Sequence, residues 1–182
     1  YLVCNGNLLF HASVPMNEDG TFRSVNILGK EYAGKAYLDE VDRLVRIACL
    51  PCRDREEYQV ALDYMWYWWC GPDSPSFDKH QMANFERYLL SDKTPQKENQ
   101  GPYYKLRNDS AVCDRILDEF GVVGEHRHII NGHVPVKTIK GESPVRADGK
   151  VLVIDGGFSR PYHDETGIAG YTLVFNSHGM QL

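Results

Sequence analysis

Two segments, residues 7–15 and 128–136, repeat one design: an apolar run, then a histidine, then Val-Pro. The apolar runs have the length and composition of buried strands, and Gly132 is expected to let the backbone turn sharply before His133. Open α/β sheets collect their ligands at the carboxyl edge of their strands. The pattern therefore predicts a fold that brings two distant histidines, His11 and His133, to one sheet edge.

Neutral imidazoles on stiff turns are good ligands for divalent transition metals, so His11 and His133 are the candidate metal ligands. The alternative is that each histidine only forms hydrogen bonds within its turn. A second alternative is the His-x-His pair of His126 and His128, whose side chains share one face of a strand. The glycine turn favours His133, because it exposes that side chain.

The composition bounds the class of protein. The 182 residues suit one domain or part of a larger one, with 42% hydrophobic and 25% charged residues, an ordinary globular balance. A net charge of −5 argues against a non-specific nucleic-acid binder. No apolar run is long enough to span a membrane, and no signal peptide is visible. The chain begins and ends within segments of strand composition, so we expect a piece of a longer polypeptide.

The five cysteines form no framework spacing and are expected to be reduced thiols in a cytoplasmic protein. Cys49 and Cys52 form a Cys-x-x-Cys pair, which could be a redox pair or half a zinc site. No second pair accompanies it, so a structural role is favoured.

Hydrophobic periodicity predicts helices over residues 37–50, 56–69 and 79–90, and a fourth that Asp109 or Ser110 caps and Gly121 ends. The second helix closes with six apolar or aromatic residues, which predicts burial on all sides or a partner surface. Lys79 and Arg87 lie about two turns apart on the third helix and are candidates for binding a substrate phosphate. The alternative there is a solvated charged face.

Residues 147–150 predict a hairpin turn before a buried strand over 151–154, and a last strand is expected over 169–175. Asp155 follows the buried strand and could orient a ligand histidine or cap a turn. The chain carries no glycine-rich phosphate fingerprint and no Gly-x-Ser-x-Gly motif.

Longer motifs carry a more specific resemblance. They are residues 69–75, 84–88, 141–144, 153–159 and 166–173, together with Ile129-Ile130-Asn131-Gly132-His133-Val134-Pro135-Val136-Lys137. These motifs resemble the class III fructose-1,6-bisphosphatases of Firmicutes and related bacteria, a branch of the calcineurin-like metallophosphoesterases. The resemblance spans essentially the whole chain, and His11 and His133 match the last two metal-histidine motifs of that superfamily.

The resemblance implies an α/β (α+β) fold, the carboxy-terminal half of a calcineurin-like metallophosphoesterase β-sandwich flanked by helices. It implies a cytoplasmic phosphoric monoester hydrolase of gluconeogenesis that removes the 1-phosphate of fructose 1,6-bisphosphate. A dinuclear Mn²⁺ centre would activate the attacking water. The implied partners are a sugar phosphate and the amino-terminal remainder of the polypeptide. A homo-oligomer is compatible with the resemblance. Binding to nucleic acid or to a membrane is not expected.

The early motifs of the superfamily, Asp-x-His, Gly-Asp-x-x-Asp and Gly-Asn-His-Asp/Glu, are absent and are expected to precede Tyr1. Two histidines alone cannot hold two hard divalent ions, which also require carboxylate oxygens, so these 182 residues by themselves are expected to be inactive. The alternatives are a protein phosphatase acting on phosphoserine or phosphothreonine, and a non-catalytic binding or assembly domain.

Overall fold

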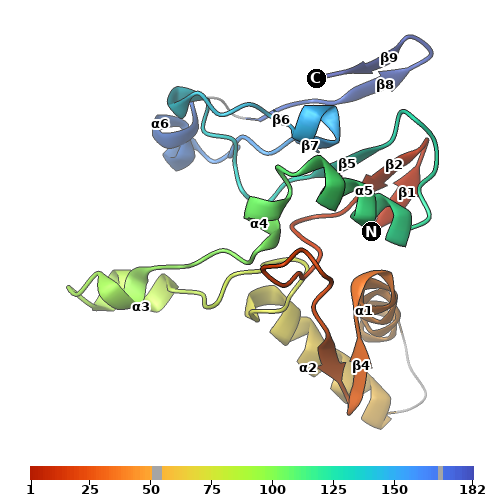
Figure 1. Cartoon of the computed structure of the whole chain (residues 1–182). Coiled ribbons are helices and arrows are strands. Elements are labelled where there is room, and N and C mark those ends of the chain that lie inside the picture. The colour runs from red at the N-terminus through yellow and green to blue at the C-terminus, as the bar shows by residue number, and fades with distance from the viewer. Residues whose placement is uncertain (51–54, 168–169) are drawn as a thin grey trace. The chain divides into compact units, whose positions relative to one another are not determined.

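The computed structural model describes residues 1–50, 55–167 and 170–182 of a mixed α/β chain (Figure 1). The chain divides into two compact units: residues 1–12 with 107–182 form unit 1, and residues 13–106 form unit 2. The predicted Cys-x-x-Cys pair lies partly outside the described residues, because Cys52 belongs to the segment 51–54. The described cysteines are free thiols: Cys4, Cys49, Cys70 and Cys113.

Unit 1 is built on one five-stranded sheet. In spatial order its strands are β1 (Leu2–Cys4), β2 (Asn7–Leu9), β5 (His128–Asn131), β7 (Val151–Val153) and β6 (Val145–Arg146). The three central strands, β2, β5 and β7, run parallel, and both edge strands are antiparallel to their neighbours. Leu8 pairs with Ile129, and both are completely buried. These apolar runs confirm the predicted buried strands, since parallel strands are covered on both faces.

The predicted hairpin turn joins β6 to β7 through a short 3₁₀ turn, η3 (Ala147–Gly149). All three of its residues take positive φ values, 48°, 53° and 90°. The rest of unit 1 consists of short elements. Helix α6 (His163–Thr166) contacts η2 (Thr138–Lys140) and η4 (Arg160–Tyr162), and β8 (Val174–Asn176) and β9 (Gly179–Gln181) form a separate antiparallel hairpin.

The last strand is shorter than predicted. Its first expected residue, Ala169, lies outside the described residues, and β8 begins only at Val174. Gly170 takes a φ of 148°, and a Cβ there would meet the Phe158 ring at 2.9 Å. The next N–H, of Tyr171, donates to the carbonyl of Ile154 rather than to a strand ladder. This bond joins residues 17 positions apart, so local sequence periodicity does not encode it.

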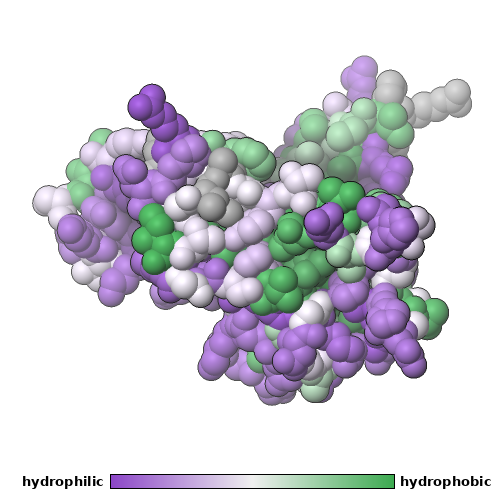
Figure 2. All heavy atoms as spheres, turned by 90° about the horizontal axis from the view of Figure 1, so that it is seen from above, coloured by the Kyte–Doolittle hydropathy of each residue, from purple (hydrophilic) through white to green (hydrophobic). Residues whose placement is uncertain are grey.

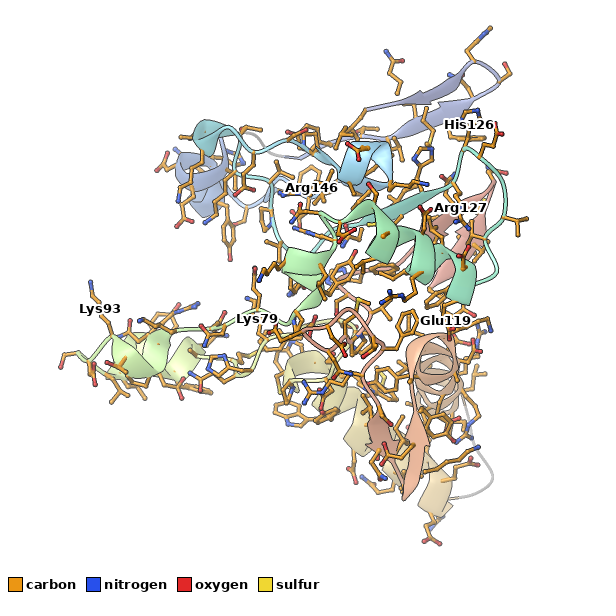
Figure 3. The ribbon with its side chains drawn as sticks, in the orientation of Figure 1. Lys79, Lys93, Glu119, His126, Arg127 and Arg146 are labelled. Atoms are coloured by element: carbon orange, nitrogen blue, oxygen red, sulfur yellow. The ribbon has the colours of Figure 1, made fainter. Side chains whose placement is uncertain are left out.

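Helix α5 (Ser110–Glu119) confirms the clearest helix of the sequence. The Asp109 side chain accepts the N–H of Ala111 at 2.8 Å, as an N-cap does, and Gly121 follows the helix with a φ of 70°. Arg127 binds Asp114 at 3.0 Å and also binds Asp118, which fastens the chain beyond the helix to its polar face (Figure 3).

Unit 2 pairs two long helices, α1 (Gly34–Cys49) and α2 (Arg55–Cys70), beside a hairpin of β3 (Val25–Ile27) and β4 (Lys30–Tyr32). Both helices agree with the predicted periodicity, and α1 begins three residues earlier than expected. Their buried residues include Tyr37, Leu44 and Trp68. A one-turn helix, α4 (Tyr103–Leu106), closes the unit. No helix in the described part of the chain is long and apolar enough to cross a membrane.

The prediction that the end of α2 is buried on all sides is wrong. Trp68 is 4% exposed, but Trp66 and Trp69 are 66% and 60% exposed. The two exposed rings pack edge to face, with centroids 5.1 Å apart. Hydrophobic side chains also reach the surface among hydrophilic ones on the face shown in Figure 2. Trp68 packs against α1, where its Nε1–H donates to the hydroxyl of Tyr37 at 3.2 Å, so burial is confined to the side of the helix end that carries Trp68.

The predicted third helix is also shorter, since α3 spans only Asn84–Leu89 and is followed by η1 (Thr94–Gln96). Lys79 lies outside it in an isolated bridge with Gln100, and the N–H of His80 donates to the carbonyl of Asn99 at 3.0 Å. These antiparallel contacts hold the chain extended where the helix was expected. Figure 3 places Lys79 at the base of the arm that carries α3, and Lys93 near its far end.

Candidate metal-binding site at the sheet edge

His11 and His133 lie at the same edge of the sheet in unit 1. Because β2 and β5 are parallel, the segments that follow them leave the sheet at one edge. Backbone bonds extend the pairing past the strands, from Phe10 N–H to Ile130 O and from Gly132 N–H to His11 O. His11 Nε2 lies 3.2 Å from His133 Nδ1, and the ring centroids are 5.0 Å apart. The structure thus brings the two predicted histidines together.

The sharp turn is made by His133 rather than by Gly132. His133 has a φ of 66°, whereas Gly132 is not among the residues with positive φ. The N–H of Val134 donates to the carbonyl of Gly132 at 2.8 Å, which closes a three-residue turn centred on His133. Such a conformation is unfavourable for a non-glycine residue and is found most often at functional sites. Gly132 instead lies close to Asp155, whose Cβ would be 3.4 Å from a Cβ at that position.

Asp155 follows β7 and reaches the same edge. Its Oδ1 accepts the N–H of Gly157 at 2.8 Å, and its carbonyl accepts the N–H of Val136 at 2.8 Å. The side chain therefore caps a turn, which was one of its two expected roles. The backbone bond ties this turn to the segment just after His133. The other expected role, orienting a ligand histidine, stays a prediction.

The geometry of the two imidazoles fits ligands of one ion. With metal–nitrogen bonds of about 2.1 Å, two nitrogens on the same ion are roughly 3.0–3.4 Å apart. The observed 3.2 Å falls in this range, and it equally suits a hydrogen bond between the rings, the alternative role. Within residues 1–50, 55–167 and 170–182, no group of three or more His, Cys, Asp or Glu side chains could hold a metal ion. Metal binding by His11 and His133 stays a prediction, and it would require further donors in addition to these two.

The alternative pair of metal ligands, His126 and His128, lies in a different environment. His128 Nδ1 lies 2.7 Å from the carbonyl oxygen of Gly149, which occupies that side of its ring. His126 is exposed and precedes β5, in the segment labelled in Figure 3. Neither histidine follows the carboxyl end of a strand, where His11 and His133 lie.

Lys79 and Arg87 converge in unit 2, but on a carboxylate of the chain itself. Glu98 Oε2 lies 2.9 Å from Lys79 Nζ and 3.3 Å from Arg87 Nη2. Burial alone would raise the pKa of Glu98, but the N–H of Ala83 and the two cations outweigh it and lower that pKa. Glu98 therefore neutralises the pair predicted to bind a phosphate, and phosphate binding by Lys79 and Arg87 stays a prediction.

Sequence reasoning missed Asp78. This residue is 4% exposed, has a φ of 46° and lines a cavity of about 400 Å³ in unit 2. Burial raises the pKa of its carboxyl group to about 6. A buried carboxyl group with a shifted pKa in a cavity is a typical property of functional residues. The signal depends on burial against Gly101, which lies 23 residues further along the chain, so no local motif could reveal it.

The whole chain, residues 1–182, matches the family model described as Firmicute fructose-1,6-bisphosphatase. Proteins named "Fructose-1,6-bisphosphatase class 3" are similar over all 182 residues: 66% identical in Bacteroides fragilis, 62% in Bacteroides thetaiotaomicron and 54% in Clostridium tetani. The chain spans only 27% of the length of the two Bacteroides relatives and 28% of the Clostridium relative. No solved structure matches the chain.

Proposed function

The chain belongs to the Firmicute fructose-1,6-bisphosphatase family, and from this premise we propose that it forms part of an enzyme hydrolysing fructose 1,6-bisphosphate. The enzyme is a phosphoric monoester hydrolase of gluconeogenesis that releases the 1-phosphate, and its catalytic domain is a calcineurin-like metallophosphoesterase sandwich. The observation that carries the proposal is the approach of His11 and His133 to 3.2 Å at one sheet edge. The free thiols of the described cysteines support a reducing, cytoplasmic location.

The residues of this chain hold and orient the metal site. His11 would bind through Nε2 and His133 through Nδ1, the two nitrogens that face each other. Asp155 keeps the His133 segment in place through its carbonyl bond to Val136. When bound, a dinuclear manganese centre supplies a water of lowered pKa and a positive charge that stabilises the transition state.

The remaining ligands are expected from the rest of the full-length protein. Hard divalent ions prefer carboxylate oxygens, and two imidazoles are too few for two ions. We therefore expect residues 1–182 alone to show no turnover of fructose 1,6-bisphosphate. Measurable turnover by this segment would contradict that assignment.

Two variants of the full-length enzyme test the metal site, His11→Ala and His133→Ala. Each is expected to lose most of its bound manganese, measured by mass spectrometry of the metal, and to lose turnover of fructose 1,6-bisphosphate. His126→Ala is the matched control, because it removes an exposed imidazole of the same unit. If both variants kept metal and activity, a non-catalytic binding domain would be the better explanation. Preference for a phosphopeptide over fructose 1,6-bisphosphate would instead indicate a protein phosphatase.

A further inference from the structure

Residues 79–100 form the arm of unit 2 that carries α3 (Figure 1). None of the six residues of α3 is buried. Phe85, Tyr88 and Leu89 are 77%, 88% and 76% exposed. Their spacing, i, i+3 and i+4, places these three side chains on one side of the helix. We call them the apolar face of the arm.

Polar contacts within the arm hold its shape. The carboxylate of Glu98 accepts the N–H of Ala83 at 2.9 Å, in addition to the two cations that it binds. The side-chain amide of Gln81 donates to the carbonyls of Pro95 and Lys97 at 2.7 and 3.1 Å. The arm thus turns polar groups inward and the apolar face outward, the reverse of an element that packs on its own core.

The apolar face requires a partner on energetic grounds. Isolated helices shorter than about 12 residues are marginal in water, and most helices are stabilised by burying an apolar face. From the exposed fractions, the three side chains present on the order of 500 Å² of surface. Patches of this size mark interaction surfaces. Helix α3 is therefore built to be covered.

The charges of the arm favour a protein partner over a membrane. Helices that lie on membranes combine an apolar face with a strongly basic one. The arm carries four cations and three anions, so it is nearly neutral: Lys79, Arg87, Lys93 and Lys97 against Glu86, Asp92 and Glu98. Lys79 and Arg87 are moreover paired with Glu98. The arm thus lacks the basic surface that anionic lipids attract.

We propose that the apolar face of the arm packs against the part of the full-length polypeptide outside residues 1–182. The chain spans only 27% of the length of its Bacteroides relatives, so most of the polypeptide lies in that part. A contact of about 500 Å² on each side is typical between domains of one chain, and a single contact of this size is smaller than most stable interfaces between separate chains. Covalent linkage also gives the remainder a higher effective concentration than a second copy has.

Photocrosslinking of the full-length protein tests the proposal. Tyr88→p-benzoylphenylalanine replaces one aromatic ring by a photoreactive one at an exposed position of the apolar face. Irradiation should join residue 88 to a peptide from outside residues 1–182, in a product that runs as a single chain on a denaturing gel. Arg46→p-benzoylphenylalanine is the matched control, because its side chain is 71% exposed in the same unit but lies on α1. It should give no such product.

Three crosslinking results would overturn the proposal. They are a product of two chains, which would assign the face to a second copy, a crosslink confined to residues 1–182, and no crosslink at all. Binding of the wild-type protein to vesicles of phosphatidylcholine and phosphatidylserine, if Phe85→Asp abolished it, would also overturn the proposal by assigning the face to a membrane.

Hydroxyl-radical footprinting of the wild-type full-length protein tests the same face without a substitution. Tyr88 should be modified about 10-fold more slowly than in the urea-unfolded protein, because the core of an interface excludes water. An uncovered Tyr88, 88% exposed, would react nearly as fast as in the unfolded chain, and that result contradicts the proposal. Neither readout depends on hydrolysis, so the arm and the proposed function are tested separately.

Discussion

Asp78→Asn is expected to stabilise the region around residue 78, because it removes a buried charge. Burial raises the pKa of Asp78 from an ordinary 3.8 to about 6. At 1.36 kcal/mol per pKa unit, this shift of about two units means that ionised Asp78 destabilises the folded state by about 3 kcal/mol. Asparagine keeps the shape of the side chain and carries no charge. The substitution should therefore recover most of this free energy at neutral pH.

The pH dependence follows from the direction of the shift. The folded state holds the proton more tightly than the unfolded state, so the unfolded state ionises first as the pH rises. The destabilisation is absent below the ordinary pKa of 3.8, grows between 3.8 and about 6, and is constant above that. The advantage of Asp78→Asn should therefore be full at pH 8 and smaller at pH 5.

Hydrogen exchange measured by mass spectrometry on the full-length protein tests this. Peptides covering residues 74–101 should open on the order of 100-fold less often in Asp78→Asn than in wild type at pH 8, and on the order of 10-fold less often at pH 5. Asp63→Asn is the matched control: its carboxylate belongs to the same unit but lines another cavity, so it should leave these peptides unchanged. Faster exchange in Asp78→Asn at pH 8, or a difference that does not shrink at pH 5, would refute the reasoning.

Three further substitutions are each expected to change the stability of the folded protein or its hydrogen exchange in a stated direction. Asp109→Ala removes the acceptor of the Ala111 N–H, so the urea midpoint of the protein should fall by the equivalent of about 1 kcal/mol. Gly101→Ala forces a methyl group against the Asp78 carboxylate, so hydrogen exchange in 74–101 should accelerate, the opposite of Asp78→Asn. Glu98→Gln removes the anion between two cations. Because the pKa of Glu98 lies below its ordinary 4.5, its stabilisation is present above that pH, and the variant should be less stable by thermal unfolding at pH 7 but converge with wild type as the pH falls below 4.5.

Features that depend on residues close together in the sequence could be predicted from it. The periodicity and caps of α5 lie within one short segment, from Asp109 to Gly121, and the structure confirms them. The hairpin between β6 and β7 follows from its own turn residues, and the buried strands follow from their apolar runs. The family was identified from longer motifs, because these resemble its members: residues 69–75, 84–88, 129–137, 141–144, 153–159 and 166–173.

Features that depend on contacts between residues far apart in the sequence could not be predicted from local sequence patterns. The exposure of Trp66 and Trp69, the extended chain at Lys79 and the burial of Asp78 each depend on which segment packs alongside.

The sequence by itself determined which residues are strand ends, caps and turns, because local backbone preferences and side-chain periodicity are encoded within a few residues. The sequence also predicted that His11 and His133 share one sheet edge, but only the tertiary structure decided how: β2 and β5 pair in parallel, which places the two rings 3.2 Å apart. It also decided that Gly101 leaves room for the carboxylate of Asp78. Strand pairing and burial are set by the packing of segments far apart in the chain, and the free energy of that packing is a property of the whole fold.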